Sequence, residues 1–170
     1  TFAGISPASV PAFVAAQLTR LEEIAAKRSL LGEFLTAELA DVSAITPPKV
    51  EAQDRCTHWA YMCRLVPGKV RCDRPTFVKA LAAEGVSFSD GYIKTALYGM
   101  PMFRNHSFFA GHWPVKEMGL TKMDYSRINL PVTEDILKTC MRFPLNEAMD
   151  EDYLRSVAKA VRKVAKHYAA

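Results

Sequence analysis

The chain has 170 residues, of which 49% are hydrophobic and 24% are charged, and its net charge is +4. These values are typical of a globular protein that buries a core, and they exclude a disordered chain or a strongly basic domain that binds nucleic acid. No apolar run is long enough to cross a bilayer and the N-terminus does not resemble a signal peptide, so we expect a cytoplasmic protein that contacts no membrane. Because the chain begins at Thr1, we expect it to be processed or part of a longer polypeptide.

A single long helix is predicted from residue 10 to residue 39. Ser9 followed by Val10 and Pro11 is typical of a helix N-cap with proline in the first turn. Apolar side chains then recur at helical spacing, at Val14, Leu18, Leu21, Ala25, Leu31, Leu35 and Leu39. A helix of this length would extend beyond a small compact domain. Taken alone, however, the periodicity fits an amphipathic helix of any α/β domain equally well.

A strand is predicted at residues 58–66, after the segment Thr46-Pro47-Pro48 has ended the helical unit. The strand sequence HWAYMCRLV alternates aromatic or β-branched side chains with others, and Pro67-Gly68 supplies the turn that follows. His58 opens this strand, and a histidine at a strand end more often packs or caps than reacts.

A capped helix and a second strand are predicted between residues 73 and 89. Asp73 can cap the helix, Pro75 lies in its first turn, and Gly85 supplies a left-handed stop. Val86 and Phe88 alternate with serines at the period of a half-buried strand. A loop rich in aromatic side chains follows and extends to residue 103.

Residues 104–130 have no clean period, and a loop of this length usually serves a function or covers an interface. His106 and His112 in this loop do not have the spacing of helical metal ligands, and no carboxylate joins them. The four cysteines, Cys56, Cys63, Cys72 and Cys140, show no Cys-x-x-Cys spacing. We therefore expect no metal site, and free thiols in a reducing cytoplasm.

Residues 131–170 are predicted to form a short helix, an edge strand and a final helix. Ile136 and Leu137 give the short helix an apolar side, and Pro144 favours the edge of a sheet. The start of that helix at Pro131 and the strand at residues 141–145 are implied by the family resemblance given below. Asp150 can cap the final helix, whose first turn is acidic and whose end is basic. The apolar stripe of that helix consists of Leu154, Val157, Val161, Val164 and Tyr168. Together the elements predict a small α/β domain whose few strands are covered by helices on one side.

The order of several weak motifs resembles a known family. Phe77, Leu81 and Glu84-Gly85-Val86 form the pattern F-x-x-x-L-x-x-E-G-V, a strand ending in Tyr92 follows, and Leu97, Pro101 and Phe103 form a Leu-aromatic-x-x-Pro-x-Phe turn. This series is similar to the small C-terminal domain of sugar aminotransferases of the DegT/DnrJ/StrS type, which are pyridoxal-phosphate (PLP) enzymes of fold type I. The resemblance covers nearly the whole chain. Tyr98 stands where the family commonly has His, and Ile93 where it commonly has Pro.

The resemblance implies an α+β fold with a mostly antiparallel sheet, in which residues 1–45 form a long connecting helix and residues 46–170 the small domain. It also implies that PLP is held by an N-terminal cofactor domain that precedes this chain, so that no cofactor is expected on the chain alone. The family's Asn-x-Arg before the first helix, which contacts the partner's cofactor phosphate, has no counterpart at Ala3-Gly4-Ile5. A homodimer is the assembly that the resemblance implies.

The substrate-binding candidates are four side chains of the loop region, and no catalytic or cofactor-binding residue is assigned. Tyr92 and Tyr98 are the leading candidates because a phenol offers a flat apolar face and a hydroxyl to a sugar or base. Arg104 and Trp113 are further candidates on the same reasoning about polar-tipped side chains in loops. No lysine of the chain aligns with the lysine that binds PLP, and no phosphate loop or nucleophile set is present.

The function implied is that of the C-terminal portion of an aminotransferase that acts on a keto-sugar, often nucleotide-linked, or on a cyclitol, with an amino acid as donor. Two alternatives remain open at this point. One is a PLP-dependent sugar dehydratase of the same family, in which His replaces the cofactor-binding Lys. The other is a binding or oligomerisation module without catalysis, which the absence of a nucleophile set would allow.

Overall fold

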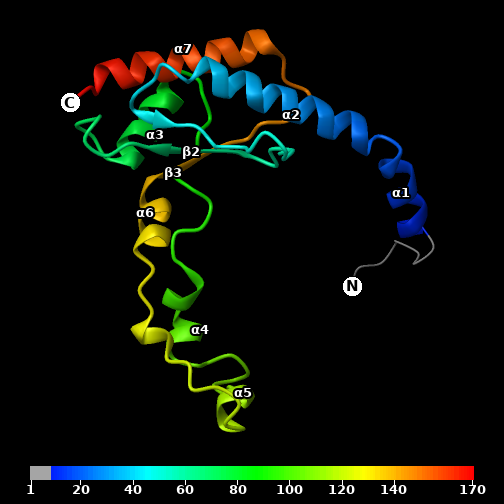
Figure 1. Ribbon diagram of the computed structural model, residues 1–170, viewed down its shortest axis with the longest axis vertical. Helices are drawn as coiled ribbons and strands as arrows, with labels where there is room; N and C mark the ends of the chain where they lie inside the picture. Colours follow the sequence, from blue (N-terminus) through cyan, green and yellow to red (C-terminus); the bar gives the residue numbers. More distant parts are fainter. Residues whose placement is uncertain (1–8) are drawn as a thin grey trace.

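A small antiparallel sheet lies at the centre of the computed structural model, which describes residues 9–170. Its strand order is β1-β2-β3, with β1 at Ile45–Thr46, β2 at Tyr61–Leu65 and β3 at Cys140–Phe143. The helices are α1 (Ser9–Leu18), α2 (Leu21–Glu38), α3 (Arg74–Ala83), α4 (Pro101–Arg104), α5 (Pro114–Glu117), α6 (Pro131–Thr139) and α7 (Glu151–His167). The predicted class, a mixed fold with a small antiparallel sheet and a covering layer of helices, is confirmed (Figure 1).

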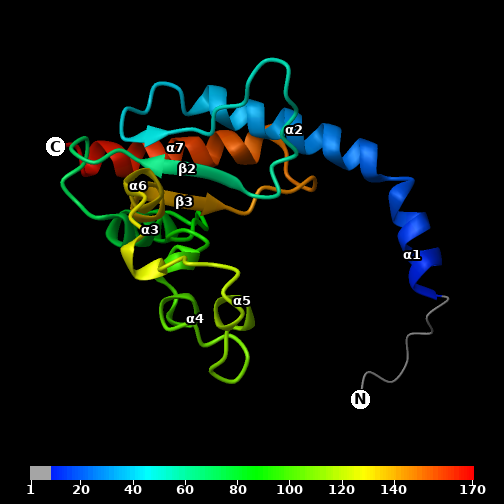
Figure 2. The same cartoon turned by 60° about the horizontal axis from the view of Figure 1, so that its bottom comes forward.

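The sheet buries only one of its faces under the helices. Tyr61, Cys63 and Leu65 alternate along β2 and are all buried, and Met141 and Phe143 of β3 are buried beside them. The helical layer opposite them consists mainly of α2 and α7, which lie side by side in both views (Figures 1 and 2). Because side chains alternate across a strand, Met62, Arg64 and Arg142 lie on the other face, which we call the open face.

The final helix follows its predicted pattern. The Asp150 carboxylate accepts a hydrogen bond from the Tyr153 backbone N–H at 2.8 Å, as an N-cap should. Leu154, Val157, Val161 and Val164 are buried against the sheet and α2, while Tyr168 is only partly buried. The cap of α3 is also confirmed, because Asp73 accepts from the Thr76 N–H at 3.0 Å. Gly85 ends that helix in the left-handed conformation with φ of +80°.

The long N-terminal helix is divided in two, which corrects the prediction of one helix over residues 10–39. α1 ends at Leu18 and α2 begins at Leu21. At the break the Thr19 hydroxyl donates to the Ala16 carbonyl at 2.8 Å, and the Arg20 N–H turns back to the Gln17 carbonyl at 3.1 Å. These short-range bonds replace the i to i−4 ladder, and the chain bends there (Figure 1).

Two predicted strands are shorter than expected. Residues 58–60 do not join β2, because His58 adopts a left-handed conformation with φ of +44° before the strand begins at Tyr61. Val86 and Phe88 are buried as the alternation predicts, but the segment forms only one bridge, between Ser89 and Arg142. Pro144 follows β3 at the edge of the sheet, as its sequence predicts.

A projecting lobe follows the single Ser89 bridge. Residues 92–130, here called the outer lobe, leave the sheet edge and return at α6, and Figure 1 shows them extending away from the helical layer. The lobe holds only short turns of helix, among them 3₁₀ turns at Leu97–Gly99 and Tyr125–Arg127. None of the helices within residues 9–170 is both long and apolar enough to cross a membrane.

His58 is a packing residue beneath α2. Its side chain is 4% exposed, lies 5.8 Å from the Tyr61 ring centre to centre, and occupies the space above Gly32. A Cβ atom at Gly32 would overlap the imidazole ring. Glycine at this point of α2 is therefore explained by the close approach of His58, as the sequence interpretation of His58 as a packing residue implies.

The first prediction concerns this contact. Gly32→Ala is expected to lower the free energy of unfolding by about 1–3 kcal/mol because the new methyl group overpacks against His58. In a His58→Gly background the same change is expected to stabilise by about 0.5–1 kcal/mol, the usual gain for alanine in a helix interior. Urea unfolding of the wild type, Gly32→Ala, His58→Gly and the double variant measures the effect of Gly32→Ala on the unfolding free energy in both backgrounds. The same sign in both backgrounds would contradict the proposed contact.

The second prediction concerns acid stability. Burial lowers the pKa of His58 below its ordinary value of 6.5, with Glu33 only partly opposing the shift. The unfolded chain therefore binds a proton at His58 more tightly than the folded chain does. The folded state consequently loses stability as the pH falls below the pKa of His58 in the unfolded chain. His58→Asn keeps a residue that tolerates the left-handed backbone but does not titrate. Between about pH 7.5 and about pH 5.5 the wild type is expected to lose more unfolding free energy than this variant. An equal loss would mean that His58 is not held neutral.

Candidate functional site

Two exposed aromatic rings and an arginine meet on the open face. The Trp59 and Tyr92 rings lie edge to face with centroids 5.1 Å apart. The Arg142 guanidinium carbon lies 5.7 Å from the Trp59 ring centre and 5.4 Å from that of Tyr92. The two rings remain 63% and 59% exposed, so both keep free surface. We call these three residues the aromatic–arginine cluster.

The backbone fixes the position of the cluster. Arg142 pairs with Met62 across the β2–β3 ladder, so its side chain leaves the sheet on the open face. Its backbone also exchanges two hydrogen bonds with Ser89, of 2.8 and 3.1 Å. Gly91, with φ of +98°, then turns the chain so that Tyr92 lies over Arg142. The left-handed His58 similarly precedes Trp59.

Tyr98 lies farther along the outer lobe and is tied to α6. Its hydroxyl donates to the Glu134 Oε1 atom at 2.6 Å. Donation of this bond to the Glu134 carboxylate stabilises the protonated phenol. Together with partial burial, the bond raises the pKa of Tyr98 above its ordinary value. Glu134 lies in the first turn of α6, where the helix dipole favours a carboxylate. The pair therefore anchors the lobe to α6 while one face of the Tyr98 side chain stays partly accessible.

Trp113 belongs to an aromatic cluster inside the outer lobe. Its ring lies 4.5 Å from His106, 5.4 Å from Phe108 and 5.5 Å from Tyr125, centre to centre. Phe103 packs edge-on against Phe108 at 4.9 Å. These contacts give the lobe a small core in the absence of long helices, which is why an irregular sequence can hold its shape. The buried His106 Nε2 atom has no hydrogen-bond partner among the described residues.

Arg104 is exposed at the end of a short helix of the outer lobe. It ends α4 and lines an open hollow of about 340 Å³ with Gly99, Pro101, Asn105 and Ser126. Within residues 9–170 the contacts of Tyr92, Tyr98, Arg104 and Trp113 are with other residues rather than with one another. No pocket found in this part of the chain is lined by more than one of the four candidates.

Sequence reasoning did not single out Arg142 or Trp59. Arg142 lies in the predicted edge strand, one residue out of phase with the buried Met141 and Phe143. That alternation could have placed a lone cation on the open face. No sequence signal pairs it with Trp59 and Tyr92, because the three come from separate segments that only the sheet register brings together.

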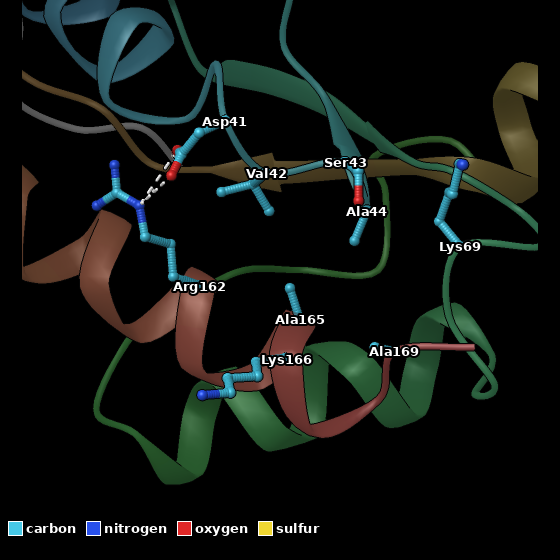
Figure 3. A pocket seen from close by; sticks show the side chains of 9 residues that line it. All are labelled: Asp41, Val42, Ser43, Ala44, Lys69, Arg162, Ala165, Lys166 and Ala169. Carbon is cyan, nitrogen blue, oxygen red and sulfur yellow. Dashed lines mark hydrogen bonds and ion pairs between the residues drawn. The ribbon is translucent and has the colours of Figure 1, made fainter.

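Another hollow, of about 300 Å³, lies where the end of α7 meets the turn that precedes β1 (Figure 3). Arg162 lines it but is bound to Asp41 through two hydrogen bonds of 3.1 and 3.2 Å. Lys69 and Lys166 lie at other points of the rim and do not converge with Arg162. The hollow is therefore a junction of packed elements and not a site with convergent polar groups.

The lysines of residues 9–170 are all exposed. A lysine that binds PLP covalently is usually desolvated or activated by a neighbour. No group of three or more His, Cys, Asp or Glu side chains in that part of the chain is arranged to hold a metal ion. Burial raises the pKa of the Cys63 thiol to about 12, so this cysteine is inert.

Comparison with known proteins identifies the class to which this arrangement belongs. The model of the DegT/DnrJ/EryC1/StrS aminotransferase family matches residues 9–162. The chain therefore belongs to this family. No curated protein sequence matches the chain.

Solved structures with the same fold include several aminotransferases. PseC of Helicobacter pylori, an aminotransferase involved in the biosynthesis of pseudoaminic acid, has a TM-score of 0.69 and 14% identity, over 91% of this chain and 36% of PseC. DesI, solved in the presence of its TDP-sugar product, has a TM-score of 0.65 and 17% identity, over 87% of this chain and 33% of DesI. Spr1654 of Streptococcus pneumoniae, a putative sugar aminotransferase solved in its PLP form, has a TM-score of 0.60 and 15% identity, over 90% of this chain and 34% of Spr1654. The chain thus spans about a third of the length of these proteins.

The third prediction concerns Tyr98. In an active full-length protein, Tyr98→His is expected to change the ratio of kcat/KM between competing keto-sugars several-fold, and to lower the unfolding midpoint no more than Tyr98→Phe does, because both variants lose the bond to Glu134. Tyr98→Phe, which keeps the ring and loses the bond to Glu134, is the control for stability. Parallel losses of activity toward all substrates and of stability would instead make Tyr98 a packing residue.

Proposed function

We propose that this chain is the C-terminal small domain of a PLP-dependent aminotransferase that transfers an amino group from an amino acid to a keto-sugar or cyclitol. The family match over residues 9–162 is the observation that carries this proposal. The fold shared with DesI, whose structure was solved with a TDP-sugar product, supports a nucleotide-linked sugar as the substrate class.

In this proposal the open face and the outer lobe form one wall of the substrate cleft. The exposed rings of Trp59 and Tyr92 offer flat surfaces for a sugar or a base, and the Tyr98 hydroxyl offers a polar contact. Arg104 and Trp113 would serve farther out along the lobe. The catalytic groups would be supplied by an N-terminal cofactor domain, where PLP provides the chemistry of amino transfer.

The exposed apolar surface of α1 supports the same arrangement. Phe13, Val14 and Leu18 are 67%, 48% and 59% exposed, and α1 touches little of the rest of the chain. Large apolar side chains that are exposed together on one helix are typical of an interface. We propose that residues 1–45 connect the small domain to the cofactor domain and that residues 46–170 form the small domain. We also propose that the whole protein is a homodimer in the cytoplasm, where the free thiols of Cys56 and Cys72 stay reduced.

The fourth prediction tests this assignment. After incubation with PLP and reduction with borohydride, the isolated chain is expected to show at most scattered substoichiometric pyridoxyl adducts by intact mass, because its exposed lysines form only labile imines and none is desolvated to retain the cofactor. The full-length protein is expected to carry one adduct per chain, on a lysine outside this segment, and to aminate a keto-sugar when L-glutamate or L-glutamine is added.

The outcomes separate the alternatives. A stoichiometric adduct on one lysine of this chain would contradict the assignment of the cofactor to another domain. Loss of water from the sugar with no amination would identify the dehydratase of the same family. A full-length protein that neither binds PLP nor acts on a sugar would leave a binding or oligomerisation module.

A further inference from the structure

Arg142 is the arginine of the open face that has no acceptor within residues 9–170. Arg64, on the same face, is bound to Asp135 and Thr139, and Arg74, beside it, donates to the backbone carbonyls of Leu137 and Cys140. Arg142 makes no ion pair or side-chain hydrogen bond in this part of the chain, and its Nε atom is buried without a partner. The Nε–H group of Arg142 has therefore lost its water without gaining an acceptor, as has that of Arg74, while the other nitrogens of Arg142 are not buried.

The aromatic rings hold the guanidinium in place without using its donors. Trp59 and Tyr92 approach within 5.7 and 5.4 Å of its central carbon, as in cation–π contacts. Because the two rings are inclined at 75° to each other, the guanidinium can stack face-on against at most one of them. Neither contact is a hydrogen bond to an oxygen acceptor, so both leave donors of Arg142 for an anion. The backbone of Arg142 is fixed by β2 on one side and by Ser89 on the other. The side chain is therefore oriented before any ligand binds, which lowers the entropic cost of binding.

From this geometry we propose that the aromatic–arginine cluster is a subsite for an anionic oxygen group of the substrate. The planar fork of Arg142 matches a carboxylate or a phosphate, which it can bind through two parallel hydrogen bonds. The free surfaces of Trp59 and Tyr92 would contact the adjoining apolar part of the ligand. That this ligand is a substrate of amino transfer rests on the proposed function, whereas the anion subsite itself does not.

Two sources of the anion fit the proposed reaction. One is the carboxylate of the amino acid donor, and the other is the phosphate of a nucleotide-linked sugar. Both present paired oxygens to Arg142, so the experiment uses probes of each kind. L-glutamate and glutarate represent the carboxylate, and inorganic phosphate and UDP represent the phosphate.

Trp59 itself can report binding. The chain contains two tryptophans, so in a Trp113→Phe background the intrinsic fluorescence comes from Trp59 alone. In this background we expect a saturable change of fluorescence with one probe class, at concentrations on the order of millimolar, beyond that of sodium chloride at equal ionic strength. Arg142→Gln is expected to weaken binding by at least about tenfold, and Arg142→Lys nearly as much because it lacks the fork.

Arg155→Gln is the matched control. Arg155 also lies over a ring, with its guanidinium carbon 5.0 Å from the Phe34 centre, but it is paired with Asp152 and Glu151 at 2.6 and 3.0 Å. Its loss is expected to leave binding unchanged, since its donors are already occupied. Circular dichroism of each variant verifies that the fold is kept, and the affinities of folded variants are compared.

Each outcome decides the inference. Saturation by the carboxylates or by the phosphates, abolished by Arg142→Gln, supports the subsite and identifies its source. No saturable change with any probe, or equal binding by the wild type and Arg142→Gln, would overturn it. In the full-length protein Arg142→Gln is expected to raise KM for the matching substrate about tenfold or more. Anion binding without any amination would support the subsite and refute the proposed function. Amination by Arg142→Gln with unchanged KM values for the donor and for the sugar would support the proposed function and refute the subsite.

Discussion

One-sided burial of the three-stranded sheet is the constraint on which the rest of the structure depends. Tyr61, Cys63 and Leu65 of β2 are directed into the core with Phe143 of β3, and α2 and α7 cover them. Because the side-chain period of a strand is two, this burial forces the alternate residues onto the open face. Arg142 is among them, and its placement follows from the same register that builds the core.

The open face is then shaped by two departures from regular structure. Left-handed backbone at His58 precedes Trp59, and left-handed Gly91 precedes Tyr92, so both rings reach the same arginine. Beyond Tyr92 the outer lobe is held by its own aromatic cluster and by the bond between Tyr98 and Glu134. The aromatic side chains of this region therefore have two roles: those inside the lobe give it shape, and those at the sheet edge remain available for contact.

Local signals predicted the elements whose stability is local. The caps at Asp73 and Asp150 and the stripe of the final helix could be located from residue type and spacing, and the structure agrees. The break at Thr19 could not, because apolar spacing continues through it and side-chain bonds to the backbone decide the bend. The bridge at Ser89 and the meeting of Trp59, Tyr92 and Arg142 depend on contacts between distant segments, which periodicity does not encode. Of the aromatic–arginine cluster, only Tyr92 was among the sequence candidates, and their role in substrate binding stays a prediction, while Trp59 and Arg142 were not singled out.

Membership of the DegT/DnrJ/EryC1/StrS aminotransferase family gives these surfaces a context. Within residues 9–170 the lysines are exposed and the apolar side of α1 is uncovered, which fits the proposal that this chain forms one wall of a substrate cleft. In the proposed arrangement the helical layer supports the fold, the open face would meet the substrate, and the connecting helix would meet a neighbouring domain.

Hydroxyl-radical footprinting, read by mass spectrometry, tests this central claim most directly. Labelling of Phe13, Trp59 and Tyr92 is compared between the isolated chain and the full-length protein, with Tyr153 on the outer side of α7 as the internal control. The account predicts that the first three are strongly labelled in the isolated chain and protected in the full-length protein, while Tyr153 reacts equally in both. Equal labelling of Phe13 and Trp59 in the two proteins would contradict the account.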